Sequence, residues 1–196
     1  MPSKNRQIFI LLRHAEREDF QKNTFGDMTP LTTRGKDTAQ MLGKKFSQVP
    51  IDAIYTSPLL RCVQTANEFI KGLGNKCPIH FSNILGDPGP FIRDPEKAGS
   101  VFLETPLPEI LQAIAGGKRL PGMRSMEEGC KLFLDYTKKM NTRVSLMISH
   151  DSIISLLGAY FFKDKEVLNY IPGFLEGFRF ESDAQYLKNI TRFIDS

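Results

Sequence analysis

Short apolar runs alternate with longer amphipathic stretches along this chain of 196 residues. Three runs are rich in β-branched residues and are bounded by polar or turn residues: 8–12 (IFILL), 51–57 (IDAIYTS) and 143–149 (RVSLMIS). Such runs are typical of strands that are buried on both faces of a parallel sheet. A weaker strand is predicted at 78–82 (PIHFS).

Helical periodicity fills the intervals between these strands. Apolar residues recur at helical spacing over 34–47, 59–73, 126–140 and 152–162. The third of these helices is expected to begin after Ser125, because Glu128 follows three residues later and completes a capping box. Strands that alternate with helices predict an α/β fold, a three-layer α/β/α sandwich with a mostly parallel central sheet.

Two segments depart from this alternation. Near the C-terminus, 174–182 and 184–193 predict an antiparallel edge hairpin with its turn near Ser182 and Asp183. Residues 83–124 contain six prolines and read as a long irregular excursion with a short helix near 107–115. Such excursions are commonly functional, so we interpret this one as a cap or substrate loop of a single domain spanning 1–196; a plain surface insertion is the alternative.

Composition limits the classes of protein to consider. Hydrophobic residues make up 41% of the chain and charged residues 24%, as in ordinary globular proteins. The net charge of +4 is spread along the chain, so we expect no nucleic-acid partner. No apolar run approaches the roughly 20 residues that span a bilayer, and the basic start leads into a strand rather than a signal peptide, so we expect no membrane partner.

The three cysteines are Cys62, Cys77 and Cys130. They are odd in number, widely separated and not at metal-ligand spacing. Free thiols in a reducing cytoplasm are the simplest interpretation, which predicts a cytoplasmic location.

Candidate catalytic and anion-binding residues lie at or near the carboxyl ends of the predicted strands. Of the three histidines, His14 and His150 each follow a buried strand, at the edge where open α/β sheets bind ligands, whereas His80 lies in the weaker strand. Arg13 lies beside the first of these histidines. Arg17 follows three residues after His14, and Arg61 follows the second strand.

Guanidinium groups bind phosphate oxygens as planar forks. Three of them beside two imidazoles describe a pocket for a phosphate dianion. In such a pocket one unprotonated imidazole can attack phosphorus in line while the other groups bind the equatorial oxygens. A nearby acid must then protonate the leaving alkoxide.

Four short motifs in this order resemble the histidine phosphatase superfamily, which includes the cofactor-dependent phosphoglycerate mutases. They are RHAER (13–17), PLTTRG (30–35), the arginine within SPLLRCVQTA (57–66) and ISHDS (148–152). The resemblance covers roughly residues 6–182 and implies that His14 is the nucleophile, with Arg13, Arg61 and His150 completing the phosphate pocket.

The resemblance is closer to the acid-phosphatase branch. Arg17 matches the extra arginine of that branch, and Asp151, directly after His150, matches its proton donor. The mutase branch takes its acid from the region after the third strand, where this chain offers Asp87 within ILGDPGPF, so Asp87 is the second candidate. The implied enzyme needs no cofactor and no metal.

The predicted function is therefore hydrolysis of a small-molecule phosphomonoester through a phosphohistidine on His14, with Asp151 as proton donor. The alternatives are a phosphomutase, a phosphatase acting on phosphohistidine in a phosphoprotein, and a non-catalytic phospho-ligand binding module. A metal-dependent HD phosphohydrolase is disfavoured, because such enzymes need several histidine and aspartate ligands and this chain has one His-Asp pair.

The excursion is expected to select the substrate. Its basic residues are candidates for contacts to further anionic groups: Arg93, Lys118, Arg119 and Arg124. Phe91 and Phe102 are candidates for lining an apolar part of the site or for anchoring the loop.

Overall fold

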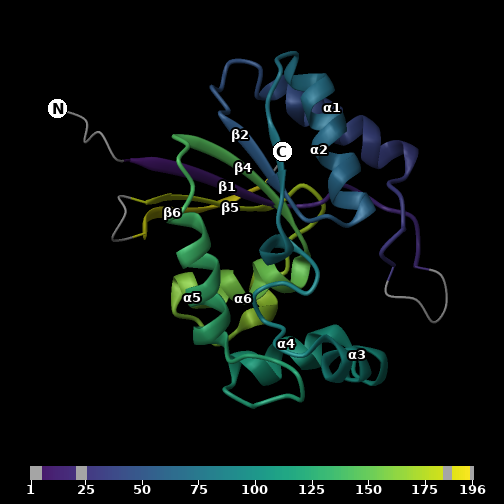
Figure 1. Cartoon of the computed structure of the whole chain (residues 1–196), viewed down its shortest axis with the longest axis vertical. Helices are drawn as coiled ribbons and strands as arrows, with labels where there is room; N and C mark the ends of the chain where they lie inside the picture. Colours follow the sequence, from purple (N-terminus) through teal and green to yellow (C-terminus); the bar gives the residue numbers. More distant parts are fainter. Residues whose placement is uncertain (1–5, 21–25, 183–186, 195–196) are drawn as a thin grey trace.

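The computed structural model describes residues 6–20, 26–182 and 187–194. Its centre is a six-stranded mixed sheet with the strand order β3-β2-β4-β1-β5-β6 (Figure 1). The strands are β1 (Gln7–Arg13), β2 (Ala53–Thr56), β3 (Ile79–Phe81), β4 (Val144–Ser149), β5 (Gly177–Ser182) and β6 (Leu187–Phe193). The first four are mutually parallel, and β5 and β6 add an antiparallel edge.

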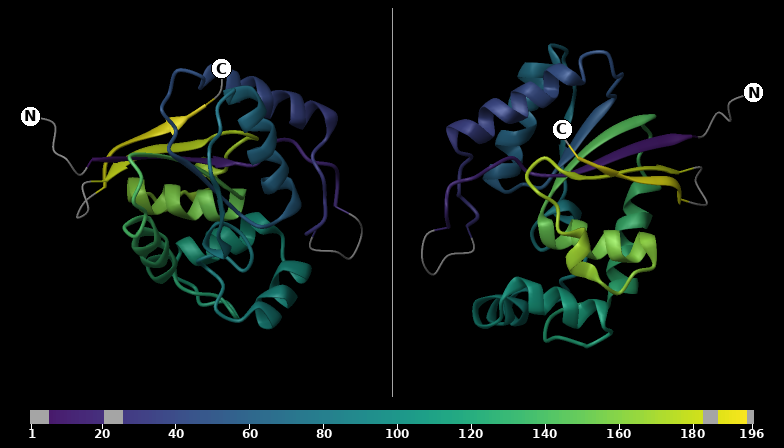
Figure 2. Two further views of the ribbon diagram at one scale, coloured as in Figure 1. Left: turned by 45° about the horizontal axis from the view of Figure 1, so that its top comes forward. Right: turned by 180° about the vertical axis from the view of Figure 1, so that it is seen from behind.

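Helices cover both faces of this sheet, which confirms the predicted sandwich. One face carries α1 (Thr33–Lys45) and α2 (Leu60–Leu73), and the other carries α5 (Met126–Thr137) and α6 (Asp151–Phe162). Beyond α6 lie α3 (Pro95–Glu104) and α4 (Leu107–Ala115), which Figure 2 shows as the far end of the molecule. Two short 3-10 helices, η1 (Asn83–Leu85) and η2 (Val167–Tyr170), complete the described elements.

Alternate residues of β1 point to opposite faces of the sheet and enter separate cores. Phe9 and Leu11 pack in the cluster on the α5–α6 side. Ile10 and Leu12 pack in the cluster beneath α1 and α2. Both faces of the strand are thus dry, which explains its unbroken apolar sequence.

Most predicted elements are present within a few residues of their expected bounds. The capping box is confirmed, since Ser125 Oγ accepts from the Glu128 backbone N–H at 3.2 Å and Glu128 Oε2 accepts from the Ser125 backbone N–H at 2.9 Å. The predicted edge hairpin corresponds to β5 and β6, and Asp183 of its expected turn lies outside the described residues. Among the described residues, no helix is long and apolar enough to cross a bilayer.

The excursion at 83–124 is more regular than predicted. Besides the expected helix α4 it contains α3, which Asp94 caps by accepting from the Lys97 backbone N–H and which Pro95 begins. Backbone hydrogen bonds close the segment at its base, from Arg93 N–H to the Gly122 carbonyl and from Arg124 N–H to the Phe91 carbonyl, each 2.8 Å. The segment therefore forms a small lobe beside the sheet; its role as a cap stays a prediction.

Candidate active site

The carboxyl ends of β1 and β4 bring the two strand-end histidines together. These strands pair in parallel with Arg13 opposite Ser149, so His14 and His150 follow at the same edge of the sheet. Their ring centroids lie 5.5 Å apart in an edge-to-face arrangement. His14 is 3% exposed and His150 is 7% exposed. The two buried imidazoles therefore lie next to each other at this edge of the sheet, as the sequence predicts.

One hydrogen bond fixes the tautomer of His14. Its Nδ1 lies 2.8 Å from the Ala15 carbonyl oxygen. Since a carbonyl only accepts, Nδ1 carries the hydrogen and Nε2 keeps its lone pair. Burial, reinforced by the charges of Arg61 and Arg13, lowers the pKa of His14 to about 3. The imidazole is therefore neutral and able to act as a nucleophile near neutral pH.

This buried neutral state predicts a pH-dependent stability. Unfolded His14 takes up a proton below about pH 6.5, whereas folded His14 does so only near pH 3, so stability is lost as the pH falls through this window. We expect its contribution to the free energy of unfolding to be about 2 kcal/mol smaller at about pH 5 than at about pH 7.5. Urea denaturation of the parent and of His14→Asn at both pH values measures the difference.

The matched control for that measurement is His80→Asn. His80 is exposed on β3, so this variant should keep the full pH dependence of the parent. An equal pH dependence in the parent and in His14→Asn would contradict the neutral, buried His14.

His150 is held by an arginine and a serine. Arg61 Nη2 donates to His150 Nδ1 at 3.2 Å, which leaves the hydrogen on Nε2, 3.0 Å from Ser57 Oγ. Burial, with Arg61 next in effect, holds the pKa of His150 well below its usual value. Ser57 is fully buried and was not among the residues expected from the sequence. Its position directly after the second strand was the available signal.

Arg13 and Arg61 each keep an unsatisfied donor at the site. Arg61 is 6% exposed and donates through Nη1 to the Gly26 carbonyl at 2.8 Å. Arg13 donates through Nη1 to the Pro172 carbonyl at 2.9 Å, with Phe174 stacked 4.4 Å from its guanidinium carbon. The Nε atoms of both arginines are buried without a hydrogen-bond partner among the described residues. Such buried donors are costly unless an acceptor binds them, which fits an anion site.

Arg17 lies beside the same pocket. Its guanidinium carbon stacks 3.5 Å from the centre of the Phe20 ring, and Nη1 donates to the Glu18 carbonyl at 2.7 Å. Burial lowers the pKa of Arg17, and the charges of Arg61 and Arg13 lower it further. Three guanidinium groups are thus gathered at one end of the pocket, where they can donate to the oxygens of a phosphate dianion.

Both candidate acids lie at the pocket. Asp151 Oδ2 forms an ion pair with Arg13 Nη2 at 2.7 Å, and Oδ1 accepts from the Ser152 backbone N–H. Asp151 is the first residue of α6, and His150 occupies the N-cap position. Asp87 is exposed at the cavity and has no hydrogen bond or ion pair with the described residues.

Gly86 brings the backbone before Asp87 against the second histidine. A methyl group at Gly86 would lie 1.8 Å from Ser57 Oγ and 3.3 Å from His150 Nε2. Only a residue without a side chain therefore allows this approach. The sequence pattern carried no sign of this contact.

The loop that carries the first histidine is anchored by the two middle motifs. Thr32 accepts from the Gly35 backbone N–H at 2.9 Å and donates to Glu16 Oε1 at 2.9 Å. Thr65 Oγ1 accepts from the Ala15 backbone N–H at 3.0 Å. The PLTTRG motif and the arginine motif thus hold the two residues that directly follow the nucleophile candidate.

Gly35 gives a test of this anchoring. A methyl group there would lie 1.9 Å from the Glu16 carbonyl oxygen. We expect Gly35→Ala to lower the free energy of unfolding by about 1–3 kcal/mol through overpacking. Thermal and urea denaturation measure the loss, with Thr33→Ala, an exposed site in the same helical turn, as the control. Equal stability of the two variants would show that the loop is not pressed against α1.

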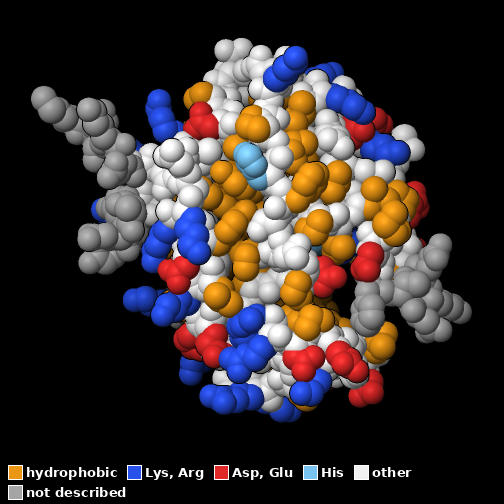
Figure 3. All heavy atoms as spheres, in the orientation of Figure 1, with side chains coloured by type: hydrophobic (Ala, Val, Ile, Leu, Met, Phe, Trp, Pro, Cys, Tyr) orange, Lys and Arg blue, Asp and Glu red, His pale blue; other side chains and the backbone are white. Residues whose placement is uncertain are grey.

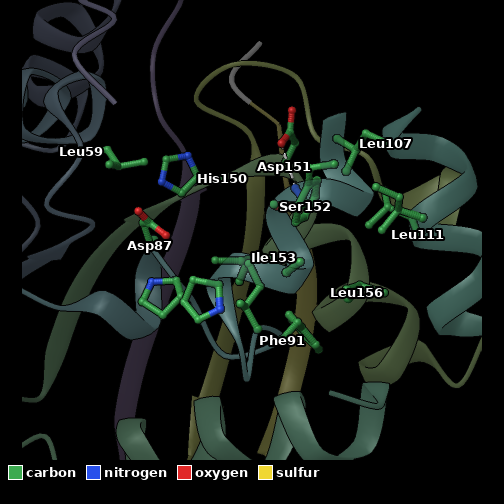
Figure 4. A pocket seen from close by; sticks show the side chains of 18 of the residues that line it. Leu59, Asp87, Phe91, Leu107, Leu111, His150, Asp151, Ser152, Ile153 and Leu156 are labelled. Atoms are coloured by element: carbon green, nitrogen blue, oxygen red, sulfur yellow. Dashed lines mark hydrogen bonds between the residues drawn. The ribbon is translucent and has the colours of Figure 1, made fainter. Parts of the chain in front are cut away.

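A cavity of about 530 Å³ opens from the histidines toward the lobe. In Figure 4, His150 and Asp87 stand at one side of this cavity and Leu107 and Leu111 at the other. Phe91 and Phe102 line the cavity, as one of the two interpretations expected.

The basic residues of the lobe do not line the cavity, so their contact with anionic groups of a substrate stays a prediction that the cavity does not support. Arg93 pairs with Glu128 at 2.7 Å, and Arg124 donates to the Pro90 and Ile92 carbonyls. Lys118 and Arg119 are exposed in the turn after α4. His80 stacks on Tyr55 and is likewise absent from the lining.

Clusters suited to a metal ion are not found in the described part of the chain. No group of three or more His, Cys, Asp or Glu side chains there is arranged to hold one. The three cysteines are free thiols.

Comparison with known proteins agrees with the fold. Residues 9–87 match the model of the histidine phosphatase superfamily (branch 1). Over 64 residues the chain is 41% identical to 2,3-bisphosphoglycerate-dependent phosphoglycerate mutase 1 of Arabidopsis thaliana, covering 32% of this chain and 19% of that one. It is 38% identical over 72 residues, 36% of each chain, to the lipopolysaccharide core heptose(II)-phosphate phosphatase of Salmonella typhimurium.

A solved phosphoglycerate mutase from Bacillus anthracis superposes on 94% of this chain and 91% of its own, with a TM-score of 0.65 and 16% identity. The chain is therefore similar in sequence to the histidine phosphatase superfamily over residues 9–87, and similar in fold to a solved phosphoglycerate mutase over most of its length. The matching model is that of branch 1, and these comparisons do not support the expected closeness to the acid-phosphatase branch.

Proposed function

We propose that this chain is a metal-independent phosphoric monoester hydrolase that works through a phosphohistidine on His14. One observation carries the proposal: the buried His14 keeps the lone pair of Nε2 at a pocket that Arg13, Arg17 and Arg61 line. Phosphatases and mutases both occur among the similar proteins, and the heptose phosphatase is one of the phosphatases.

In the first step, His14 Nε2 attacks phosphorus in line and the bond from phosphorus to the ester oxygen breaks. The leaving oxygen takes a proton and departs as an alcohol. Nδ1–H keeps its bond to the Ala15 carbonyl, which stabilises the positive charge of the phosphorylated ring. Arg13 and Arg61 bind the equatorial oxygens, whose charge they stabilise in the transition state. The His150 Nε2–H is the third donor, and it exchanges its contact with Ser57 Oγ for a phosphate oxygen.

In the second step, water attacks the phosphorus of the phosphohistidine. The carboxylate that gave up its proton takes one from this water, the bond from nitrogen to phosphorus breaks, and inorganic phosphate and neutral His14 are regenerated. Atoms and protons balance over the two steps with water as the only co-substrate.

Two side chains, Asp87 and Asp151, are candidates for the proton donor. Sequence resemblance ranked Asp151 first, but both of its oxygens accept hydrogen bonds, one of them from a guanidinium. Asp87 has no such partner among the described residues and follows the glycine that packs against His150. We therefore place Asp87 ahead of Asp151 and assign Asp151 to holding Arg13.

This assignment predicts a leaving-group effect. Asp87→Asn should lower kcat on an alkyl phosphate by about 10²–10⁴-fold, the usual contribution of a general acid. Its effect on 4-nitrophenyl phosphate should be much smaller, because that leaving group departs without a proton. Steady-state kinetics on both esters measure the two losses.

Asp151→Asn should lower both activities by a similar factor, since a misplaced Arg13 weakens phosphate binding whatever the leaving group. Asp135→Asn, at a half-buried site on α5 that does not line the cavity, is the control. If the loss of kcat depended on the leaving group in Asp151→Asn and not in Asp87→Asn, Asp151 would be the proton donor.

The proposed function is tested by phosphate release from 4-nitrophenyl phosphate in the presence of EDTA, with detection of phosphohistidine on His14 under alkaline conditions. Release of phosphate and a labelled His14 are expected. Activity that EDTA abolishes and a divalent ion restores would overturn the metal-independent mechanism. Transfer of phosphate between two positions of one substrate would favour a mutase.

A further inference from the structure

The cavity beside the histidines has two chemically different ends. Its polar end carries the arginines, histidines and aspartates described above. Its other end is walled by apolar side chains from α3, α4 and α6 and from the loop before α3: Phe91, Phe102, Leu107, Leu111, Ile153 and Leu156. Figure 4 shows Phe91, Ile153 and Leu156 gathered on one side and Leu107 and Leu111 across from them.

Positive charge is confined to the phosphate end. Of the described residues that line the cavity, the lysines and arginines are Arg13, Arg17 and Arg61 alone. Two basic residues of the lobe have partners away from the cavity: Arg93 pairs with Glu128 of α5, and Arg124 donates to the Ile92 carbonyl. In Figure 3, charged side chains gather at the lower end of the molecule, over α3 and α4, whereas hydrophobic side chains occupy the middle of the face.

A hydrophilic alcohol does not suit the apolar end. Hydroxyl or carboxylate groups placed there would lose water and find few partners, which costs binding energy. A hydrocarbon placed there gains from the removal of apolar surface from water, and the volume is within the range of pockets for small molecules. Leu103, on the lining of the cavity, is 64% exposed and offers further apolar surface to such a group.

We propose that the substrate is the phosphomonoester of a hydrocarbon alcohol, with its phosphate at His14 and its alkyl chain in the apolar end of the cavity. The proposal rests on the proposed function for the reaction at the phosphate, and it adds the chemical class of the alcohol. It disfavours substrates with a second anionic group, such as bisphosphates and phosphorylated carboxylic acids.

The test measures binding and turnover separately. Calorimetric titration of the full chain with ethyl-, butyl-, hexyl- and octylphosphonate, which are not hydrolysed, reports on the apolar end whatever the chemistry. We expect Kd to fall about fourfold for each added methylene until the cavity is filled. The value of kcat/KM for the corresponding alkyl phosphates should rise with the same dependence and exceed that for glycerol phosphate.

Two variants connect this dependence to the lobe. Leu103→Asn should flatten the dependence of Kd on chain length, because its side chain meets the hydrocarbon. Leu132→Asn, at an exposed leucine on α5 that does not line the cavity, should leave the dependence unchanged.

A Kd that does not change with chain length, or a preference for glycerol phosphate, would overturn the proposed substrate class even if phosphate is released. If binding tightened with chain length but no phosphate were released from any ester, the hydrocarbon-binding site would be supported and the proposed phosphatase activity would be contradicted. The two failures are thus distinguishable.

Discussion

Replacement of His14 by alanine is expected to lower kcat for phosphate release by at least about 10⁴-fold, as loss of a nucleophile does in other covalent enzymes. The physical reason is the free lone pair on Nε2: no other group described at the pocket presents a neutral nitrogen with its second ring nitrogen tied to a carbonyl. His150 does not substitute, because its Nδ1 accepts from Arg61 and its Nε2 carries the hydrogen.

The matched control is His80→Ala. His80, the remaining histidine, lies on β3 and does not line the cavity. Its replacement should therefore leave kcat within a factor of about two of the parent value. Formation of phosphohistidine should disappear in His14→Ala and persist in the control. Substantial turnover by His14→Ala would assign the nucleophile elsewhere.

Arg61→Lys is expected to lower kcat/KM by about 10²–10³-fold although it keeps the positive charge. Lysine cannot donate at once to the Gly26 carbonyl, to His150 and to a phosphate oxygen, as the fork of Arg61 is placed to do. His150 then loses the contact that fixes its tautomer. The loss of kcat/KM in Arg61→Lys should therefore be larger than the loss that a shifted positive charge alone would cause.

Arg34→Lys serves as the control. The Arg34 side chain, on α1, is 80% exposed, and its Nε lies 3.8 Å from Glu16 Oε2. Its kinetics should match the parent. Circular dichroism and thermal denaturation of Arg61→Lys separate a loss of activity from a loss of folding. A variant with full activity would mean that charge without the fork is sufficient.

The sequence predicted the parts of the fold that depend on local patterning. Strands β1 and β4 are apolar because both of their faces are buried, and this also placed His14 and His150 at one sheet edge. Helix α3 was missed because prolines flank it, although Asp94 and Pro95 form an ordinary helix start.

Contacts across the sheet edge were beyond sequence patterns. Ser57 and Gly86 meet His150 from segments far apart in the chain, and no periodicity encodes such a meeting. The absence of the basic residues of the lobe from the cavity lining has a different reason. Long charged side chains turn outward to solvent and to nearby partners, so their position in the sequence says little about which side of a loop they occupy.

The backbone closure at the base of the lobe, between 91–94 and 122–124, has a consequence for the function proposed above. The candidate phosphate-binding residues lie on β1 and α2 and directly after β1 and β4, whereas the apolar end of the cavity is built largely from a segment that leaves and rejoins the chain at one place. Under the proposed function, replacement of that segment would change which alcohol is accepted and would leave the candidate phosphate-binding residues in place.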